Sequence, residues 1–102
     1  MKTYTLCGSM RFEKEIREIA CYLETEMGFN ILQCTYSEKR VLTAEEAAGI
    51  VRAHYRKIDL SDGIYVVNIG GYMGNSVKEE IVYAQKAGKE ILYHEPVADR
   101  KL

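Results

Sequence analysis

Residues 64–69 read Ile-Tyr-Val-Val-Asn-Ile, and this nearly continuous apolar run limits the fold more than any other stretch of the chain. A strand that is apolar on both faces is typical of the middle of a parallel sheet, where helices cover both sides. Three further segments have strand-forming composition, at residues 2–7, 29–36 and 90–94. Apolar residues recur at helical spacing between them, which predicts helices over residues 11–27, 44–58 and 77–87. The chain therefore alternates strand and helix along its whole length.

The ends of the predicted helices carry their own signals. Gly28 follows the first helix and Gly88 the third, where glycine commonly terminates a helix. Thr43 precedes the second helix, and Glu46 follows three residues later, a spacing that predicts a capping box. These signals place the helix ends independently of the apolar pattern.

The alternation predicts an α/β fold, a doubly wound parallel sheet of flavodoxin-like or Rossmann-like type with about four strands and three helices. Right-handed crossovers favour the strand order 2-1-3-4. Strands one and three are then neighbours where the winding reverses, and ligands bind outside the carboxyl ends of the strands at such a point. We therefore expect the loop at residues 8–11 to face the loop at residues 70–76 across one crevice.

Length and charge narrow the possible functions. The 102 residues suit a single domain, which we place at residues 1–96, followed by a polar tail at 97–102. A net charge of −1 gives no field to hold a DNA or RNA duplex or an anionic membrane. The first residues contain no apolar run long enough for a signal peptide or a membrane span, so we expect a cytoplasmic protein.

The cysteines and histidines show no metal-ligand spacing. Cys7, Cys21 and Cys34 are odd in number and form no C-x-x-C pair, which argues against a disulfide framework and a zinc site. We expect all three to be buried, reduced thiols. His54 lies in the middle of the second helix, where a surface or interface role is more common than catalysis, and His94 lies on the last strand. The sequence predicts no metal and no cofactor.

The first loop, Gly8-Ser9-Met10-Arg11, has features of a phosphate site. Gly8 allows close backbone approach, Ser9 offers a hydroxyl or a helix cap, and the following helix N-terminus favours an anion. Arg11 adds a planar fork suited to phosphate. The alternative is a plain strand-to-helix turn capped by Ser9, with Arg11 in solvent.

The second loop is richer in glycine than a turn requires. Gly70, Gly71 and Gly74 leave the backbone open to a flat ring or a sugar. Tyr72 lies among them, where an aromatic ring can stack on a base. The alternative is a flexible turn with no ligand.

Two carboxylates follow this loop on the third helix. Asn75 or Ser76 can cap the helix, and with Ser76 as the cap Glu79 closes a capping box. Glu80 points about a quarter-turn away, toward the predicted crevice, and a positioned carboxylate there is suited to attack an electrophilic sugar carbon. The alternative for Glu80 is an ordinary surface glutamate at the start of a helix.

With these motifs the chain resembles the nucleoside 2-deoxyribosyltransferase-like superfamily, which includes 2′-deoxynucleoside 5′-phosphate N-hydrolases. The resemblance covers residues 4–16 and 54–96, and its most specific parts are the GSMR turn and the Glu80-Ile81-Val82-Tyr83-Ala84 segment. It implies an enzyme that cleaves or exchanges the N-glycosidic bond of a nucleoside or nucleoside 5′-monophosphate. It also implies Glu80 as the nucleophile, with Gly8, Ser9 and Arg11 at the 5′-phosphate.

The chain also departs from this family. Members commonly carry an aspartate just before the nucleophile helix, where this chain has Tyr72 and Met73, and the tyrosine expected on the first strand, Tyr4, is displaced by one position. Asp62 matches a family motif, but it precedes its strand, and we interpret it as a turn residue. A non-catalytic nucleotide-binding module is therefore the alternative function.

The second helix carries more apolar surface than one narrow core contact needs. Its apolar residues include Ala47, Ala48, Val51 and Tyr55. We expect this surface to form a homodimer.

Overall fold

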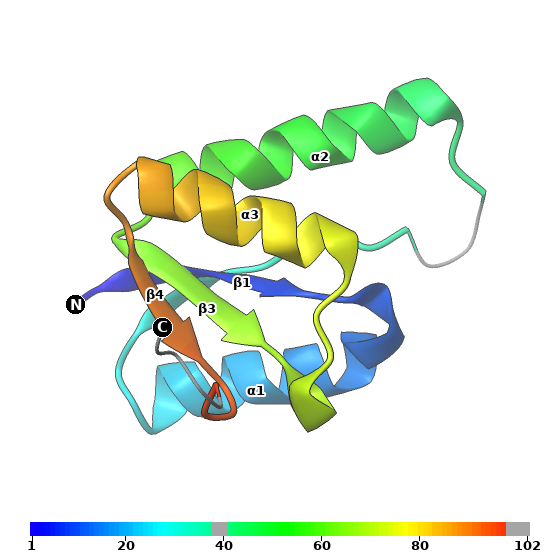
Figure 1. Ribbon diagram of the computed structural model, residues 1–102. Coiled ribbons are helices and arrows are strands. Elements are labelled where there is room, and N and C mark those ends of the chain that lie inside the picture. The colour runs from blue at the N-terminus through cyan, green and yellow to red at the C-terminus, as the bar shows by residue number, and fades with distance from the viewer. Residues whose placement is uncertain (38–40, 98–102) are drawn as a thin grey trace.

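The computed structural model describes residues 1–37 and 41–97 and shows an α/β fold with one parallel sheet (Figure 1). The strands are β1 (Thr3–Gly8), β2 (Asn30–Leu32), β3 (Gly63–Val67) and β4 (Glu90–Tyr93). The helices are α1 (Glu13–Thr25), α2 (Ala44–Asp59) and α3 (Asn75–Lys86), with short 3₁₀ turns η1 (Met10–Phe12) and η2 (Ile69–Gly71). The sheet order β2-β1-β3-β4, with every pair parallel, confirms the predicted topology.

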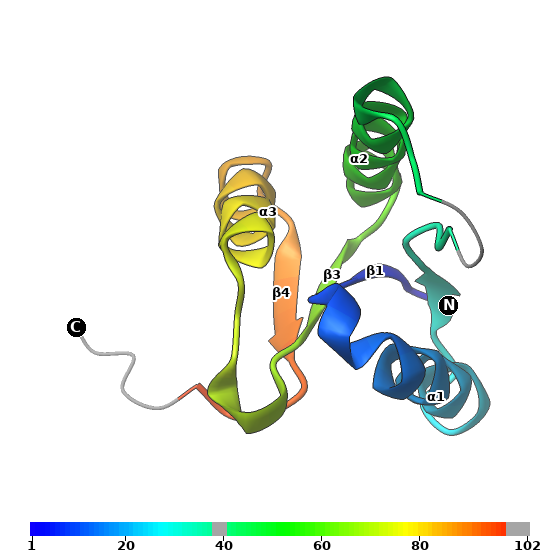
Figure 2. The ribbon, with the colours of Figure 1, turned by 90° about the vertical axis from the view of Figure 1, so that its right-hand side faces the viewer.

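Helices cover both faces of the sheet. Helix α1 lies on one face, and α2 and α3 lie on the other (Figures 1 and 2). Successive residues of β3 serve the two faces in turn, as the pleat requires: Ile64 and Val66 pack beneath α2 and α3, while Val67 packs on the α1 side. This explains why the sequence of β3 is apolar without alternation.

The second strand is much shorter than predicted. Only Asn30–Leu32 pair with β1, although residues 29–36 have strand composition. Beyond Leu32 the chain leaves the sheet, and the Lys57 ammonium of α2 donates a hydrogen bond to the Gln33 carbonyl at 2.6 Å. Residues 33–37 therefore run outside the sheet, and residues 34–37 line a cavity.

The predicted helix ends need two corrections. The first helix, expected from residue 11, begins with η1 and becomes α-helical only at Glu13, because Ser9 caps the 3₁₀ turn instead. The third helix begins at Asn75, with Gly74 as its N-cap and no side-chain cap, so the capping box between Ser76 and Glu79 is wrong. The capping box of Thr43 and Glu46 is confirmed.

The cysteines were only partly predicted. Cys7 is fully buried in β1, but Cys21 is exposed on α1 and Cys34 is half-buried. Cys21 lies on the solvent side of an amphipathic helix, whose buried positions are Ile16, Ile19, Ala20 and Leu23. Its apolar neighbours in sequence were therefore no guide to its burial.

Candidate functional site

A cavity of about 860 Å³ lies at the carboxyl end of β1, bordered by the start of α1, by α2 and by the start of α3. Its walls are the β1–η1 turn, residues 34–37, the inner side of α2, and the segment that leads into α3. Segments distant in sequence meet here, because the winding of the sheet reverses between β1 and β3. The cavity lies where the topology predicted a ligand crevice.

Most of the predicted site residues line this cavity. They are Gly8, Ser9, Met10, Tyr72, Gly74, Asn75, Ser76 and Glu80. Arg11 and Gly71 were predicted as well, but neither is among the lining residues. Gly71 instead has φ of +80°, a conformation that favours glycine and turns the chain out of η2.

Arg11 joins the two predicted loops. Its guanidinium carbon lies 4.0 Å from the centroid of the Tyr72 ring, a cation–π contact. Phe12 meets the same ring edge to face, with the centroids 6.0 Å apart. The loop after β1 therefore packs directly on the loop after β3, with Tyr72 at the contact. The two loops face each other as the topology predicted.

The turn after β1 is shaped by close packing. A Cβ on Gly8 would lie 3.0 Å from Ile16 Cδ1 and 3.1 Å from the Val67 Cβ, so glycine lets α1 and β3 approach the strand end. Ser9 Oγ accepts a hydrogen bond from the Arg11 backbone N–H at 3.3 Å. Gly8 and Ser9 thus have structural roles and also border the cavity.

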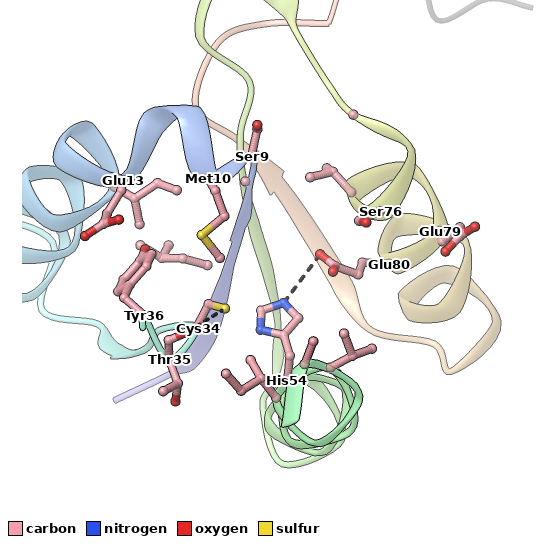
Figure 3. A pocket seen from close by; sticks show the side chains of 18 of the residues that line it. Ser9, Met10, Glu13, Cys34, Thr35, Tyr36, His54, Ser76, Glu79 and Glu80 are labelled. Carbon is pink, nitrogen blue, oxygen red and sulfur yellow. Dashed lines mark hydrogen bonds and ion pairs between the residues drawn. The ribbon is translucent and has the colours of Figure 1, made fainter. Parts of the chain in front are cut away.

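Glu79 and Glu80 have different environments. Glu79 also borders the cavity but is exposed, and Figure 3 shows its carboxylate directed away from that of Glu80. The Glu80 side chain is 13% exposed and points toward α2. Because α3 starts at Asn75, Glu80 falls in the second turn, beyond the strong positive end of the helix. Its position is set by a neighbouring side chain instead.

That neighbour is His54. Its Nε2 lies 3.4 Å from Glu80 Oε1, and its side chain is only 7% exposed (Figure 3). The same Nε2 lies 3.6 Å from the Cys7 sulfur, while Nδ1 is buried without a hydrogen-bond partner in the described part of the chain. Cys7, His54 and Glu80 thus bring together β1, α2 and α3 at the base of the cavity.

The cluster of Cys7, His54 and Glu80 was not predicted from the sequence. His54 was expected at a surface or interface, yet it lies four residues before Ile58, the fully buried residue of α2. That i,i+4 spacing places both on the inner face of the helix and was the available signal. Cys7 was correctly expected to be buried, but nothing in its spacing linked it to residues 47 and 73 positions away.

The Cys7 thiol is held in its neutral form. Burial raises its pKa well above the ordinary value, and the nearby Glu80 carboxylate raises it further. A thiol in such surroundings is a poor nucleophile on its own. The cavity-lining group suited to covalent chemistry in this cluster is therefore the Glu80 carboxylate.

Three other polar residues, Asp62, Glu95 and His94, have partners outside the cavity. Asp62 Oδ2 accepts a hydrogen bond from the Thr3 backbone N–H at 2.8 Å, a turn contact at the amino end of β3. Glu95 Oε2 accepts one from the Gly70 N–H at 3.1 Å, and His94 Nδ1 lies 2.9 Å from the Tyr65 hydroxyl. None of the three lines the cavity.

Comparisons with family models, with curated proteins and with solved structures found no match to this chain. Within residues 1–37 and 41–97, no helix is both long enough and apolar enough to cross a membrane.

Proposed function

We propose that the protein cleaves or exchanges the N-glycosidic bond of a nucleoside or nucleoside 5′-monophosphate. The observation that carries the proposal is the Glu80 carboxylate, partly exposed and fixed by His54 in a cavity between two loops. The cavity volume of about 860 Å³ suits a small-molecule ligand of nucleotide size. The resemblance of the GSMR turn and of residues 80–84 to deoxyribosyltransferase-like enzymes supports the same chemistry.

Glu80 acts as the nucleophile in this proposal. Its carboxylate attacks the anomeric carbon of the sugar as the bond to the base breaks, and the departing base keeps the bonding electron pair and takes a proton from solvent water. Water or a second base then displaces the glutamate and releases the sugar. His54 contributes by holding one carboxylate oxygen at 3.4 Å, which limits the directions in which Glu80 can point.

In this proposal the two loops bind different parts of the substrate. Gly8, Ser9 and Arg11 receive the 5′-phosphate, with Arg11 turning from the Tyr72 ring to reach it. The start of α3 adds to this site, because its N-cap Gly74 leaves the first backbone N–H groups without a side-chain cap. Tyr72 and Tyr36, which both line the cavity, offer ring faces to the base.

The proposal is tested by base release. The protein is incubated with the four deoxynucleoside 5′-monophosphates and the matching nucleosides, with and without a second free base, and the products are separated by chromatography. Free base from the monophosphates indicates a hydrolase that uses the phosphate loop. A nucleoside with an exchanged base indicates a transferase.

A non-catalytic nucleotide-binding module is the second candidate, and one observation favours it. Tyr72 and Met73 stand where the family that the chain resembles commonly has an aspartate, and Glu13, an acid on the α1 side of the cavity, is engaged in an ion pair with Arg17 at 2.9 Å. In this alternative, nucleotides raise the melting temperature while no base is released.

We also propose that the chain forms a homodimer through α2. Its first half is exposed and includes Ala48 and, at the edge of the cavity that they also line, Ala47 and Val51; the buried residues of the helix are His54 and Ile58. A second copy packed there would cover apolar surface that this chain leaves in solvent.

A further inference from the structure

Three side chains of different chemistry converge at the base of the cavity. Cys7 Sγ, a nitrogen of His54 and a carboxylate oxygen of Glu80 all lie within 4.8 Å of one another. We propose that these three residues bind a divalent transition-metal ion of the zinc class. This site does not rest on the proposed cleavage reaction, but it shares the Glu80 carboxylate with it, so a bound ion would hold the group that the reaction uses.

Two of the three ligand pairs have the spacing of a tetrahedral metal site. With Zn–S near 2.3 Å and Zn–N and Zn–O near 2.1 Å, two ligands of a tetrahedron lie about 3.6 Å apart for sulfur and nitrogen, and about 3.4 Å for nitrogen and oxygen. The distances from His54 Nε2 are 3.6 Å to the Cys7 sulfur and 3.4 Å to Glu80 Oε1. The third pair, the Cys7 sulfur and the Glu80 carboxylate oxygen, lies within 4.8 Å, and closing it to the about 3.6 Å of a tetrahedron brings an ion into reach of all three atoms.

The use of one nitrogen for both contacts distinguishes this cluster from a hydrogen-bonded triad. In a triad one ring nitrogen faces the nucleophile and the other faces the carboxylate. Here both the sulfur and the oxygen approach Nε2, which has either one proton or one lone pair. An ion at the point of convergence accepts a lone pair from each of the three atoms, and the ring proton is then on Nδ1.

The ligand set and the position of the cluster indicate the type of ion. A thiolate and an imidazole favour zinc or cobalt over magnesium and calcium, which prefer oxygen ligands. Binding releases the Cys7 proton to solvent as the sulfur–metal bond forms. Because His54 and Glu80 line the cavity, the fourth position of the ion faces it and is open to water or a solute.

The test is a cobalt titration of the reduced, untagged full chain without nucleotide, followed by absorption spectroscopy. We expect one Co²⁺ per chain, a sulfur-to-cobalt charge-transfer band and visible bands of tetrahedral cobalt, all displaced by Zn²⁺. The charge-transfer band should disappear in Cys7→Ser and persist in the matched control Cys21→Ser, whose thiol is exposed on α1.

A second pair of variants tests the site without changing a buried thiol. Glu80→Gln should weaken Zn²⁺ binding by at least about tenfold in calorimetry. Glu79→Gln, its neighbour with an exposed carboxylate, should bind as the wild type does. The absence of a sulfur-to-cobalt band in folded wild-type protein would overturn the proposal. So would a band that persists in Cys7→Ser, or equal Zn²⁺ affinity in the two glutamine variants.

Discussion

At the residue scale, neighbouring side chains differ in what they contact. Glu79 and Glu80 are adjacent, yet one faces solvent and the other meets a buried histidine. The sequence could separate the directions of the two side chains, since a step of one residue turns a side chain by about 100° around a helix, but the capping role predicted for Glu79 was wrong. It could not identify His54 as the partner, because that contact depends on how α2 packs across the sheet.

Arg11 provides a test of the phosphate loop. Arg11→Ala should weaken the binding of deoxynucleoside monophosphates by at least about tenfold, because a bidentate charged contact is lost. The affinity for the matching nucleosides, which have no phosphate, should be almost unchanged. Calorimetry with both ligand classes measures the difference, and an equal loss for both classes would show that Arg11 serves only to position Tyr72.

Tyr4 predicts a specific loss of stability at high pH. Its hydroxyl donates a hydrogen bond to Glu90 Oε1 at 2.6 Å, and burial followed by this bond raises the pKa of Tyr4 to about 12. Because the folded pKa is higher than the unfolded value of 10.0, the contribution is complete below pH 10 and is lost as the pH rises toward 12. Denaturant unfolding between pH 8 and 11 should show wild-type stability falling relative to Tyr4→Phe.

The matched variant removes only the ionisable hydroxyl, so other groups that titrate in this range cancel in the comparison. Parallel stability curves for the two proteins would contradict the assignment of Tyr4. The same bond lowers the pKa of Glu90, together with Lys2. That contribution is present above the unfolded value of 4.5 and is lost as the pH falls through the folded pKa.

At the element scale, the strands and helices were predictable where local signals agreed with packing. The run in β3 and the capping box of α2 were correctly assigned because periodicity and end signals pointed the same way. The second strand was overestimated, since strand composition alone does not show where an edge strand loses its partner. The start of α3 was misplaced because Gly74 takes the N-cap without a side-chain hydrogen bond.

Two glycine substitutions should have opposite effects on stability. A Cβ on Gly63 would lie 2.3 Å from the Glu90 carbonyl oxygen, within the β3–β4 pair, so Gly63→Ala should destabilise the fold by about 1–3 kcal/mol. Gly49 lies within α2, where an added Cβ would meet only Arg52 Nη2 at an ordinary contact distance of 3.7 Å, so Gly49→Ala should stabilise the fold by about 0.5–1 kcal/mol. Chemical denaturation measures the change in the free energy of unfolding for both variants. An unchanged value in Gly63→Ala would contradict the prediction, because it would show that β3 and β4 can move apart without cost.

At the scale of the whole molecule, the topology was the most predictable property. Alternating elements and right-handed crossovers led to the order β2-β1-β3-β4 and to a crevice between the loops after β1 and β3. The third wall of the cavity, formed by residues 34–37 and α2, did not follow from these rules. This wall forms because β2 ends early, and the point at which β2 ends is determined by tertiary packing.

The proposed homodimer is a prediction at this scale. Light scattering after size exclusion should give twice the 11.7 kDa chain mass for the wild type. Ala48→Glu should give a monomer, because it places a charge in the exposed apolar part of α2. The control Glu18→Lys changes an exposed residue on α1, on the other face of the sheet, and should remain dimeric. A wild-type monomer at micromolar concentration would contradict the dimer.

The central claim is that Glu80 is the nucleophile of an N-glycosidic cleavage, and the most direct measurement compares two neighbouring glutamates. Base release from deoxynucleoside monophosphates is measured with the wild type, Glu80→Gln and Glu79→Gln, each confirmed to be folded. We predict a rate loss on the order of 10³-fold or more in Glu80→Gln, as expected for loss of a covalent nucleophile, and a near wild-type rate in Glu79→Gln. Equal rates in the two variants, or no base release from a wild-type protein that still binds the nucleotides, would contradict the claim.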